Sequence, residues 1–217
     1  MEAIHILKKI FLTPIKKGVI MNIKLQKIFL AVLFISVCIA ADKNEPGPLV
    51  GTTAKFWSLK TVDGSFEKLN NYTAPQDETW TGDGERKVIV FSFFASWCQP
   101  CIKEIGELHK LQDDYKDAPV QFFLVNLTDF FRHREKDTKQ YRDAPDAMEF
   151  LERKGLTDIT VLQDPTGRTA RAYGVNDVLP RLFVIDKYRT VAMDETGLCP
   201  TCLQDELSPL LDKLIAD

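Results

Sequence analysis

Two pairs of cysteines with the same spacing carry most of the chemistry that this 217-residue sequence offers. Cys98 and Cys101 form one pair, Cys199 and Cys202 form the other, and Cys38 stands alone. Two cysteines separated by two residues can close a small disulfide or supply half of a zinc site. The elements that position each pair decide between these chemistries.

The first pair lies between a predicted strand and a predicted helix. Residues 87–94 form an almost unbroken apolar and β-branched run, typical of a strand buried on both faces. Apolar residues then recur at steps of three and four from 101 to 115, which indicates an amphipathic helix. Free amide groups and the dipole at a helix N-terminus favour a thiolate. We therefore expect Cys98 to be the nucleophile and Cys101 the resolving cysteine; a zinc half-site or a static disulfide is the alternative.

The remaining elements alternate between strand and helix patterns, which predicts an α/β protein. We expect a hairpin around Asp63-Gly64, and we interpret the charged stretch 132–142 as a loop or a solvated helix. Further strands are predicted at 120–127, 160–162, 181–185 and 190–193, and further helices at 144–154, 168–173 and 203–215.

Residues 93–101, with the sequence FFASWCQPC, resemble the active-site stretch of the thioredoxin superfamily. From Leu49 to the C-terminus the chain is similar to the exported TlpA/ResA-like branch of that superfamily. The matching segments are Ile102-Lys103-Glu104, Ala170 with Tyr173-Gly174-Val175, Leu179-Pro180 and Phe183-Val184-Ile185-Asp186. This resemblance implies a thioredoxin-like three-layer α/β/α fold with a mixed central sheet and an N-terminal β-hairpin.

The resemblance also assigns residues that contact the substrate. Pro180 matches the family's cis-proline beside the cysteines, and Leu179 is the residue whose backbone binds an extended substrate chain. Trp97 matches the aromatic residue that precedes the reactive cysteine. The alternative for Pro180 is an ordinary trans proline at a strand edge.

Glu104 matches an acid that this branch places one turn after the resolving cysteine, where a carboxylate could exchange protons with Cys101. The alternative is a solvated glutamate on a helix surface. Thioredoxin itself carries a buried acid in the strand before the active site, and Ser92 stands at that position here. The chain departs from the branch at Gly106, where a proline is usual.

The second pair, Cys199 and Cys202, is not part of the usual family pattern, so its placement must come from topology. If the strand 181–185 runs antiparallel to the strand 87–94, the strand 190–193 returns toward the end that carries Cys98. Both pairs then share one sheet edge. We predict either a second redox pair or a structural disulfide, with a metal site as the third alternative.

The N-terminal segment has the layout of a signal peptide, in which lysines precede the apolar run 28–40 and a polar stretch follows. Cleavage is predicted after Ala40, with Met21 as an alternative start. An uncleaved membrane anchor and lipid attachment at Cys38 are the other hypotheses. The expected organisation is a leader over 1–40, a linker over 41–48 and one domain over 49–217.

The charge distribution and the motifs together reduce the number of possible functions. The net charge is −3 and the basic residues are scattered, so nucleic acid is not an expected partner. We expect a periplasmic or extracellular thiol-disulfide oxidoreductase, more specifically a reductase, that exchanges disulfides with protein thiols. An upstream electron donor, such as a membrane thiol transporter, is the second partner; we expect a monomer with no cofactor and no metal. A metal- or copper-handling thioredoxin-fold protein is one alternative, and a thiol peroxidase, which Ala95 disfavours, is the other.

Overall fold

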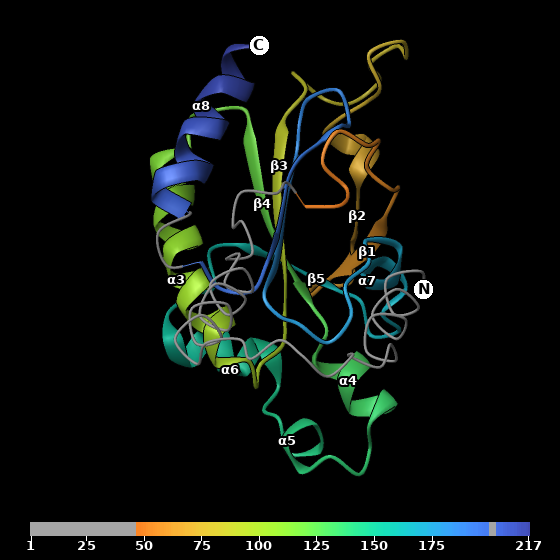
Figure 1. The fold of residues 1–217 in the computed structure, drawn as a ribbon, viewed down its shortest axis with the longest axis vertical. Coiled ribbons are helices and arrows are strands. Elements are labelled where there is room, and N and C mark those ends of the chain that lie inside the picture. The colour runs from red at the N-terminus through yellow and green to blue at the C-terminus, as the bar shows by residue number, and fades with distance from the viewer. Residues whose placement is uncertain (1–46, 200–202) are drawn as a thin grey trace, which may run out of the picture. The chain divides into compact units, whose positions relative to one another are not determined.

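A mixed sheet of seven strands in the order β2-β1-β5-β4-β3-β6-β7 organises the residues that the structure describes (Figure 1). The computed structural model describes residues 47–199 and 203–217. The predictions for the leader, its cleavage and Cys38 therefore lie outside the described residues. The strands are β1 (Ser58–Thr61), β2 (Phe66–Lys68), β3 (Val88–Phe94), β4 (Val120–Asn126), β5 (Thr160–Gln163), β6 (Arg181–Ile185) and β7 (Val191–Thr196).

Helices cover both faces of this sheet, which gives the predicted three layers. The helix α3 and the C-terminal helix α8 lie on one face, and α7 lies on the other (Figure 1). The helical elements are η1 (Leu69–Asn71), α3 (Gln99–Asp114), α4 (Thr128–Arg134), α5 (Lys139–Arg142), α6 (Ala147–Lys154), α7 (Arg168–Ala172), η2 (Leu203–Leu207) and α8 (Ser208–Ala216).

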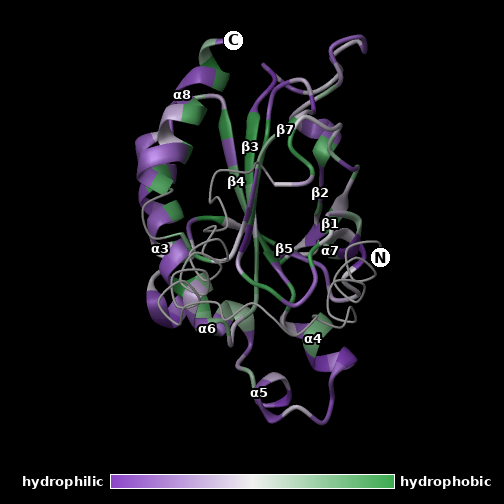
Figure 2. Cartoon of the chain, viewed as in Figure 1, coloured by the Kyte–Doolittle hydropathy of each residue, from purple (hydrophilic) through white to green (hydrophobic). Residues whose placement is uncertain are grey.

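The central strand β3 is buried along its whole length, as its apolar run predicted. It pairs in parallel with β4 and antiparallel with β6. Phe91 and Phe93 project to one face, where their rings pack against Tyr173 and Phe183. Ser92 projects to the other face, toward α3. All residues of β3 except Ser92 are apolar, so the strand carries hydrophobic colour in Figure 2.

The N-terminal hairpin is present and extends the sheet. Strands β1 and β2 pair antiparallel, and β1 then pairs antiparallel with β5. Gly64 has φ +92, a left-handed conformation that suits glycine, and the Asp63 carboxylate accepts a hydrogen bond from the Ser65 amide at 3.0 Å. The Asp-Gly turn predicted from the sequence is confirmed.

Two helical segments differ from the sequence prediction. The region predicted as a loop or solvated helix carries α4 and α5, and α4 begins earlier, at Thr128, with Phe130 and Phe131 buried. The predicted closing helix 203–215 is divided into a π-helical turn, η2, followed by α8. Pro209 in the first turn of α8 supplies no backbone N–H, so the regular α-helical hydrogen-bond pattern cannot run through this point.

Candidate active site

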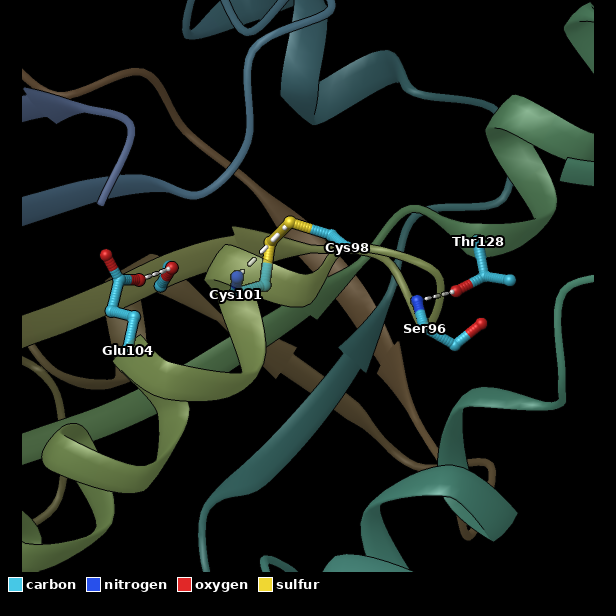
Figure 3. The surroundings of a disulfide bond; sticks show 6 residues. Ser96, Cys98, Cys101, Glu104 and Thr128 are labelled. Atoms are coloured by element: carbon cyan, nitrogen blue, oxygen red, sulfur yellow. Dashed lines mark hydrogen bonds between the residues drawn. A yellow bond between two sulfur atoms is a disulfide. The ribbon is translucent and has the colours of Figure 1, made fainter. Parts of the chain in front are cut away.

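Cys98 and Cys101 form a disulfide at the start of α3, with their Cα atoms 5.3 Å apart (Figure 3). Cys98 is the N-cap residue of α3, and Pro100 occupies the first turn, where its missing N–H removes no helical hydrogen bond. The Cys101 amide donates a hydrogen bond to the Cys98 sulfur at 3.2 Å. This donor and the helix dipole favour a thiolate on Cys98 when the pair is reduced. Cys101 is fully buried, whereas Cys98 lines a surface groove.

Behind the disulfide, Glu104 is buried with only 3% of its surface exposed, so the hypothesis of a solvated glutamate is wrong. It lies one turn after Cys101 on α3, and its carboxyl group accepts a hydrogen bond from the Ser92 hydroxyl of β3 (Figure 3). Burial raises the pKa of Glu104 from 4.5 to about 7, and the Ser92 hydrogen bond, which favours the carboxylate, limits the rise. A carboxyl group that titrates near neutral pH is suited to proton exchange.

The Leu179-Pro180 peptide bond is cis, so the alternative of an ordinary trans proline is wrong. Pro180 directly precedes β6, whose first residue, Arg181, pairs with Phe93 of β3. This register brings the proline to the sheet end from which β3 leads to Cys98. Leu179 and Cys98 line the same groove, whose volume is about 410 Å³.

Trp97 packs against two aromatic side chains from the segment after β4. Its ring centroid lies 5.3 Å from that of Phe131 in α4 and 4.7 Å from that of Tyr141 in α5. Gln140 of α5 lines the groove together with Asp177, Val178 and Leu179 of the loop 177–179. The segment that follows β4 therefore builds one wall of the groove beside Cys98.

The turn before Cys98 is fixed by hydrogen bonds to the same segment. The Ser96 amide donates to the Thr128 hydroxyl at 3.0 Å (Figure 3), and the Ser96 hydroxyl donates to the Pro145 carbonyl at 2.7 Å. The Thr128 amide in turn donates to the Asn126 side chain at 2.9 Å. These bonds attach the turn that carries Trp97 and Cys98 to the end of β4.

Charged groups are paired beside Pro180. Arg181 forms an ion pair with Asp194, whose side chain is fully buried and also accepts a hydrogen bond from the Leu49 amide at 3.1 Å. Burial raises the pKa of the neighbouring Glu195, and the negative charges of Glu206 and Asp194 add to the rise.

Cys199 lies near this edge as well. Strand β7 ends at Thr196 opposite Arg181, and the Gly197 amide donates a hydrogen bond to the Pro180 carbonyl at 2.8 Å. The predicted return of the chain toward the Cys98 end is therefore confirmed. Cys199 follows two residues later and is disulfide-bonded. Cys202 lies outside the described residues.

Sequence reasoning predicted Cys98, Cys101, Glu104 and Pro180 as site residues. The structure places the first three in the first turns of α3, and the pairing of β6 with β3 places Pro180 at the same end of the sheet. Sequence reasoning missed the contribution of the segment after β4. This segment lines the groove through Gln140 and packs against Trp97 through Phe131 and Tyr141. Aromatic residues next to the charged stretch were the available signal. It also did not identify Ser92 as the partner of Glu104, because the two residues are 12 positions apart and meet only when α3 packs on β3.

Comparisons with known proteins agree with this geometry. The model of the AhpC/TSA family matches residues 50–193. The thioredoxin-like protein YneN of Bacillus subtilis is 31% identical over 131 residues, which cover 58% of this chain and 67% of the relative. The thiol-disulfide oxidoreductase ResA of Geobacillus thermodenitrificans is 28% identical over 148 residues, covering 68% and 70% of the two chains.

Solved structures show the same fold. A structure from Chlorobium tepidum, assigned as the thiol:disulfide interchange protein DsbE, superposes with a TM-score of 0.57 at 28% identity and covers 76% of this chain and 97% of its own. A thioredoxin-like protein from Aeropyrum pernix has 16% identity and a TM-score of 0.54, and the match covers 88% of this chain and 98% of the neighbour. At this identity it shows the fold alone. The chain therefore belongs to the AhpC/TSA family and has a thioredoxin-like fold, and its relatives include proteins named as thiol-disulfide oxidoreductases.

Proposed function

We propose that this protein is an exported thiol-disulfide oxidoreductase that acts as a reductase on protein disulfides. The observation that carries the proposal is the Cys98–Cys101 disulfide at the N-terminus of α3, together with the buried Glu104 on the same helix and the cis-Pro180 that follows Leu179 of the adjoining groove. Each of these groups has a role in disulfide exchange, and the names of the relatives describe the same chemistry.

In the reducing direction the protein begins as a dithiol. The Cys98 thiolate attacks one sulfur of a substrate disulfide, which forms a mixed disulfide and releases the first substrate thiolate. The Cys101 thiol then loses its proton and attacks the Cys98 sulfur, which releases the second substrate thiolate and closes the Cys98–Cys101 disulfide. Two electrons pass to the substrate, and the upstream donor returns the pair to the dithiol state.

Glu104 is the proposed proton carrier for Cys101. The two residues are three positions apart on one helix and therefore lie on the same face, and both are buried. With a pKa raised to about 7, the Glu104 carboxylate can accept the Cys101 proton and later release it. Cys101 is closed off from water, so a protein group is needed for this transfer.

Substrate binding is proposed for Trp97, Leu179 and Pro180. Leu179 lines the groove next to Cys98, and its backbone precedes a cis-proline, so an extended chain could pair with it beside the reacting sulfur. Trp97 contributes an aromatic surface to the same groove.

The proposed location is outside the cytoplasm, in the periplasm or the extracellular space. Support comes from the signal-peptide layout before Ala40 and from the chemistry, because disulfides persist in oxidising compartments and are edited there. Within the described residues, no helix has the length and apolar character required to cross a bilayer. A membrane thiol transporter is the proposed source of electrons.

We further propose that Cys199 and Cys202 form a second redox pair that exchanges with the first. The Gly197–Pro180 hydrogen bond supports this, because it attaches the chain just before Cys199 to the active-site proline. The competing hypothesis is a structural disulfide. A double Cys199→Ser, Cys202→Ser variant separates the two: a relay pair is needed for reduction of Cys98–Cys101 by the donor, whereas a structural pair changes only stability.

The test of the main proposal uses the purified full chain. A Cys101→Ser variant should trap a mixed disulfide with substrate through Cys98, and a Cys98→Ser variant should trap none at that site. The reduction potential of the Cys98–Cys101 pair should lie near the thioredoxin value of about −270 mV. A value near that of a strong oxidant, about −120 mV, would overturn the reductase direction.

The match to the AhpC/TSA model makes a thiol peroxidase the second candidate. The position three residues before Cys98, where a peroxidase of this kind would carry a threonine, is the buried Ala95. Rapid peroxide turnover with a thiol donor would favour the peroxidase. Stoichiometric, tight metal binding without disulfide exchange would favour a metal- or copper-handling protein; in the described ranges no group of three or more metal-ligating side chains is gathered.

A further inference from the structure

Part of the lining of the groove beside Cys98 has no role in the function proposed above. One side is the loop 177–179, in which Val178 is a large apolar side chain with 55% of its surface exposed. The other side is α5, which contributes Gln140. Helices α4 and α5 lie beyond the end of the sheet, below the start of α3 in Figure 1. An extended chain that reaches Cys98 would pass between these two sides.

An ion pair joins the loop 177–179 to α4, the helix that precedes α5. The guanidinium of Arg134, at the end of α4, pairs with the carboxylate of Asp177 in the loop. The same guanidinium lies over the rings of Phe130 and Phe131, 5.1 and 4.9 Å from their centroids. The guanidinium therefore packs on buried aromatic side chains while it pairs with the exposed Asp177 of the loop and with Glu135.

The α5 wall is attached to the active-site turn by aromatic packing. Tyr141, the neighbour of Gln140, packs against both Trp97 and Phe131, with ring centroids 4.7 and 5.5 Å apart. Because Trp97 directly precedes Cys98, the position of α5 is tied to that of the reactive sulfur. The short α5 thus has contacts that hold it in place although all four of its residues lie near the surface.

We propose that α5 and the loop 177–179 form a two-walled groove that selects substrate, and that it prefers an extended polypeptide with an apolar side chain next to its cysteine. Val178 contacts that side chain, and the Gln140 amide, which can both donate and accept, binds the backbone opposite. Arg134 and Asp177 are positioning residues that set the separation of the walls. This inference rests on the proposed disulfide exchange.

The first experiment compares two peptide disulfides that differ only in leucine or aspartate beside the cysteine. The wild-type full chain should turn over the leucine peptide about fivefold more efficiently, as partial burial of one aliphatic side chain allows. Val178→Asp should abolish or reverse this preference, mainly through KM. Val62→Asp is the matched control, because Val62 is 53% exposed in the turn between β1 and β2. Equal effects of Val178→Asp and Val62→Asp, or an equal loss for both peptides, would overturn the proposal.

The second experiment tests the ion pair. Asp177→Asn should raise KM for the leucine peptide about threefold with kcat unchanged, since a surface pair contributes little energy but holds the loop. Asp177→Glu keeps the charge and should restore KM. If the asparagine and glutamate variants behave alike, or if kcat falls instead of KM rising, the positioning role is wrong.

A third measurement separates failure of this inference from failure of the proposed function. The leucine peptide is made with serine in place of cysteine, so that it cannot react, and its binding to the oxidised full chain is followed by NMR chemical shifts. Binding that weakens about fivefold in Val178→Asp and not in Val62→Asp supports the groove even if the protein proves to be an oxidant. Equal binding to both variants and to wild type would refute the groove while leaving disulfide exchange intact.

Discussion

Replacement of Glu104 by glutamine should change how the stability of this protein depends on pH. Glutamine keeps the size of the buried side chain and a hydrogen-bond partner for Ser92, but it cannot ionise. In the wild-type protein, burial raises the pKa of Glu104 from 4.5 to about 7, so the folded state holds this proton more tightly than the unfolded state. The carboxylate form therefore destabilises the folded protein, and replacement by glutamine removes this destabilisation.

The sign and size of the effect follow from this difference. Below pH 4.5 the group is protonated in both states and has no effect on the pH dependence. As pH rises from 4.5 to about 7 the unfolded chain loses the proton first, so wild-type stability falls. This difference between the folded and unfolded pKa values of Glu104 corresponds to about 3 kcal/mol of unfolding free energy, which the wild-type protein has lost above pH 7. The Glu104→Gln variant should gain about this amount over wild type between pH 4 and pH 8.

The assay is urea unfolding of the oxidised full chain at several pH values, with the free energy of unfolding of each variant compared with that of wild type. The comparison cancels the titration of all other groups. Glu107→Gln is the control, because it removes a carboxylate from a more exposed position of the same helix, where it pairs with Lys110. If the difference between Glu104→Gln and wild type stays constant across the pH range, Glu104 does not titrate as a buried acid and its role as proton carrier is refuted.

Three further substitutions test the contacts around the site. Ser92→Ala removes the hydrogen bond that favours the Glu104 carboxylate, so NMR titration should show the pKa of Glu104 rising further; an unchanged pKa would contradict the contact. Asp194→Ala leaves the Arg181 guanidinium buried without its partner, and urea unfolding should show a loss of about 3–5 kcal/mol; a loss below 1 kcal/mol would mean that the pair is solvated. Asp146→Ala removes the carboxylate that accepts hydrogen bonds from the Met148 and Glu149 amides of α6, at 2.9 and 3.1 Å, and should cost about 1 kcal/mol of stability in the same assay; an unchanged stability would contradict the capping role.

Local patterns in the sequence were sufficient to predict the strand and the helix that carry the disulfide. The apolar run 87–94 is typical of a strand buried on both faces, and the three- and four-residue steps after Cys101 place the pair at a helix start. Gly155 ends α6 in the left-handed conformation, as expected of a glycine after a helical pattern. These features depend on residues that are neighbours in the chain, so periodicity and capping residues report them directly.

The burial of Glu104 and the lining of the groove depend on contacts between distant segments, so only the tertiary structure decided them. The sequence left open whether Glu104 is a proton carrier or a solvated glutamate, and the side chain is buried because α3 packs it onto Ser92 of β3. The charged stretch after β4 looks solvated, and it becomes a wall of the active-site groove because Tyr141 packs on Trp97 and Arg134 reaches Asp177. The sequence by itself indicated that Cys98 and Cys101 are a cysteine pair at a helix start. The tertiary structure decided the proton affinity of the acid behind them and the shape of the groove in front, because both depend on burial between segments far apart in the chain.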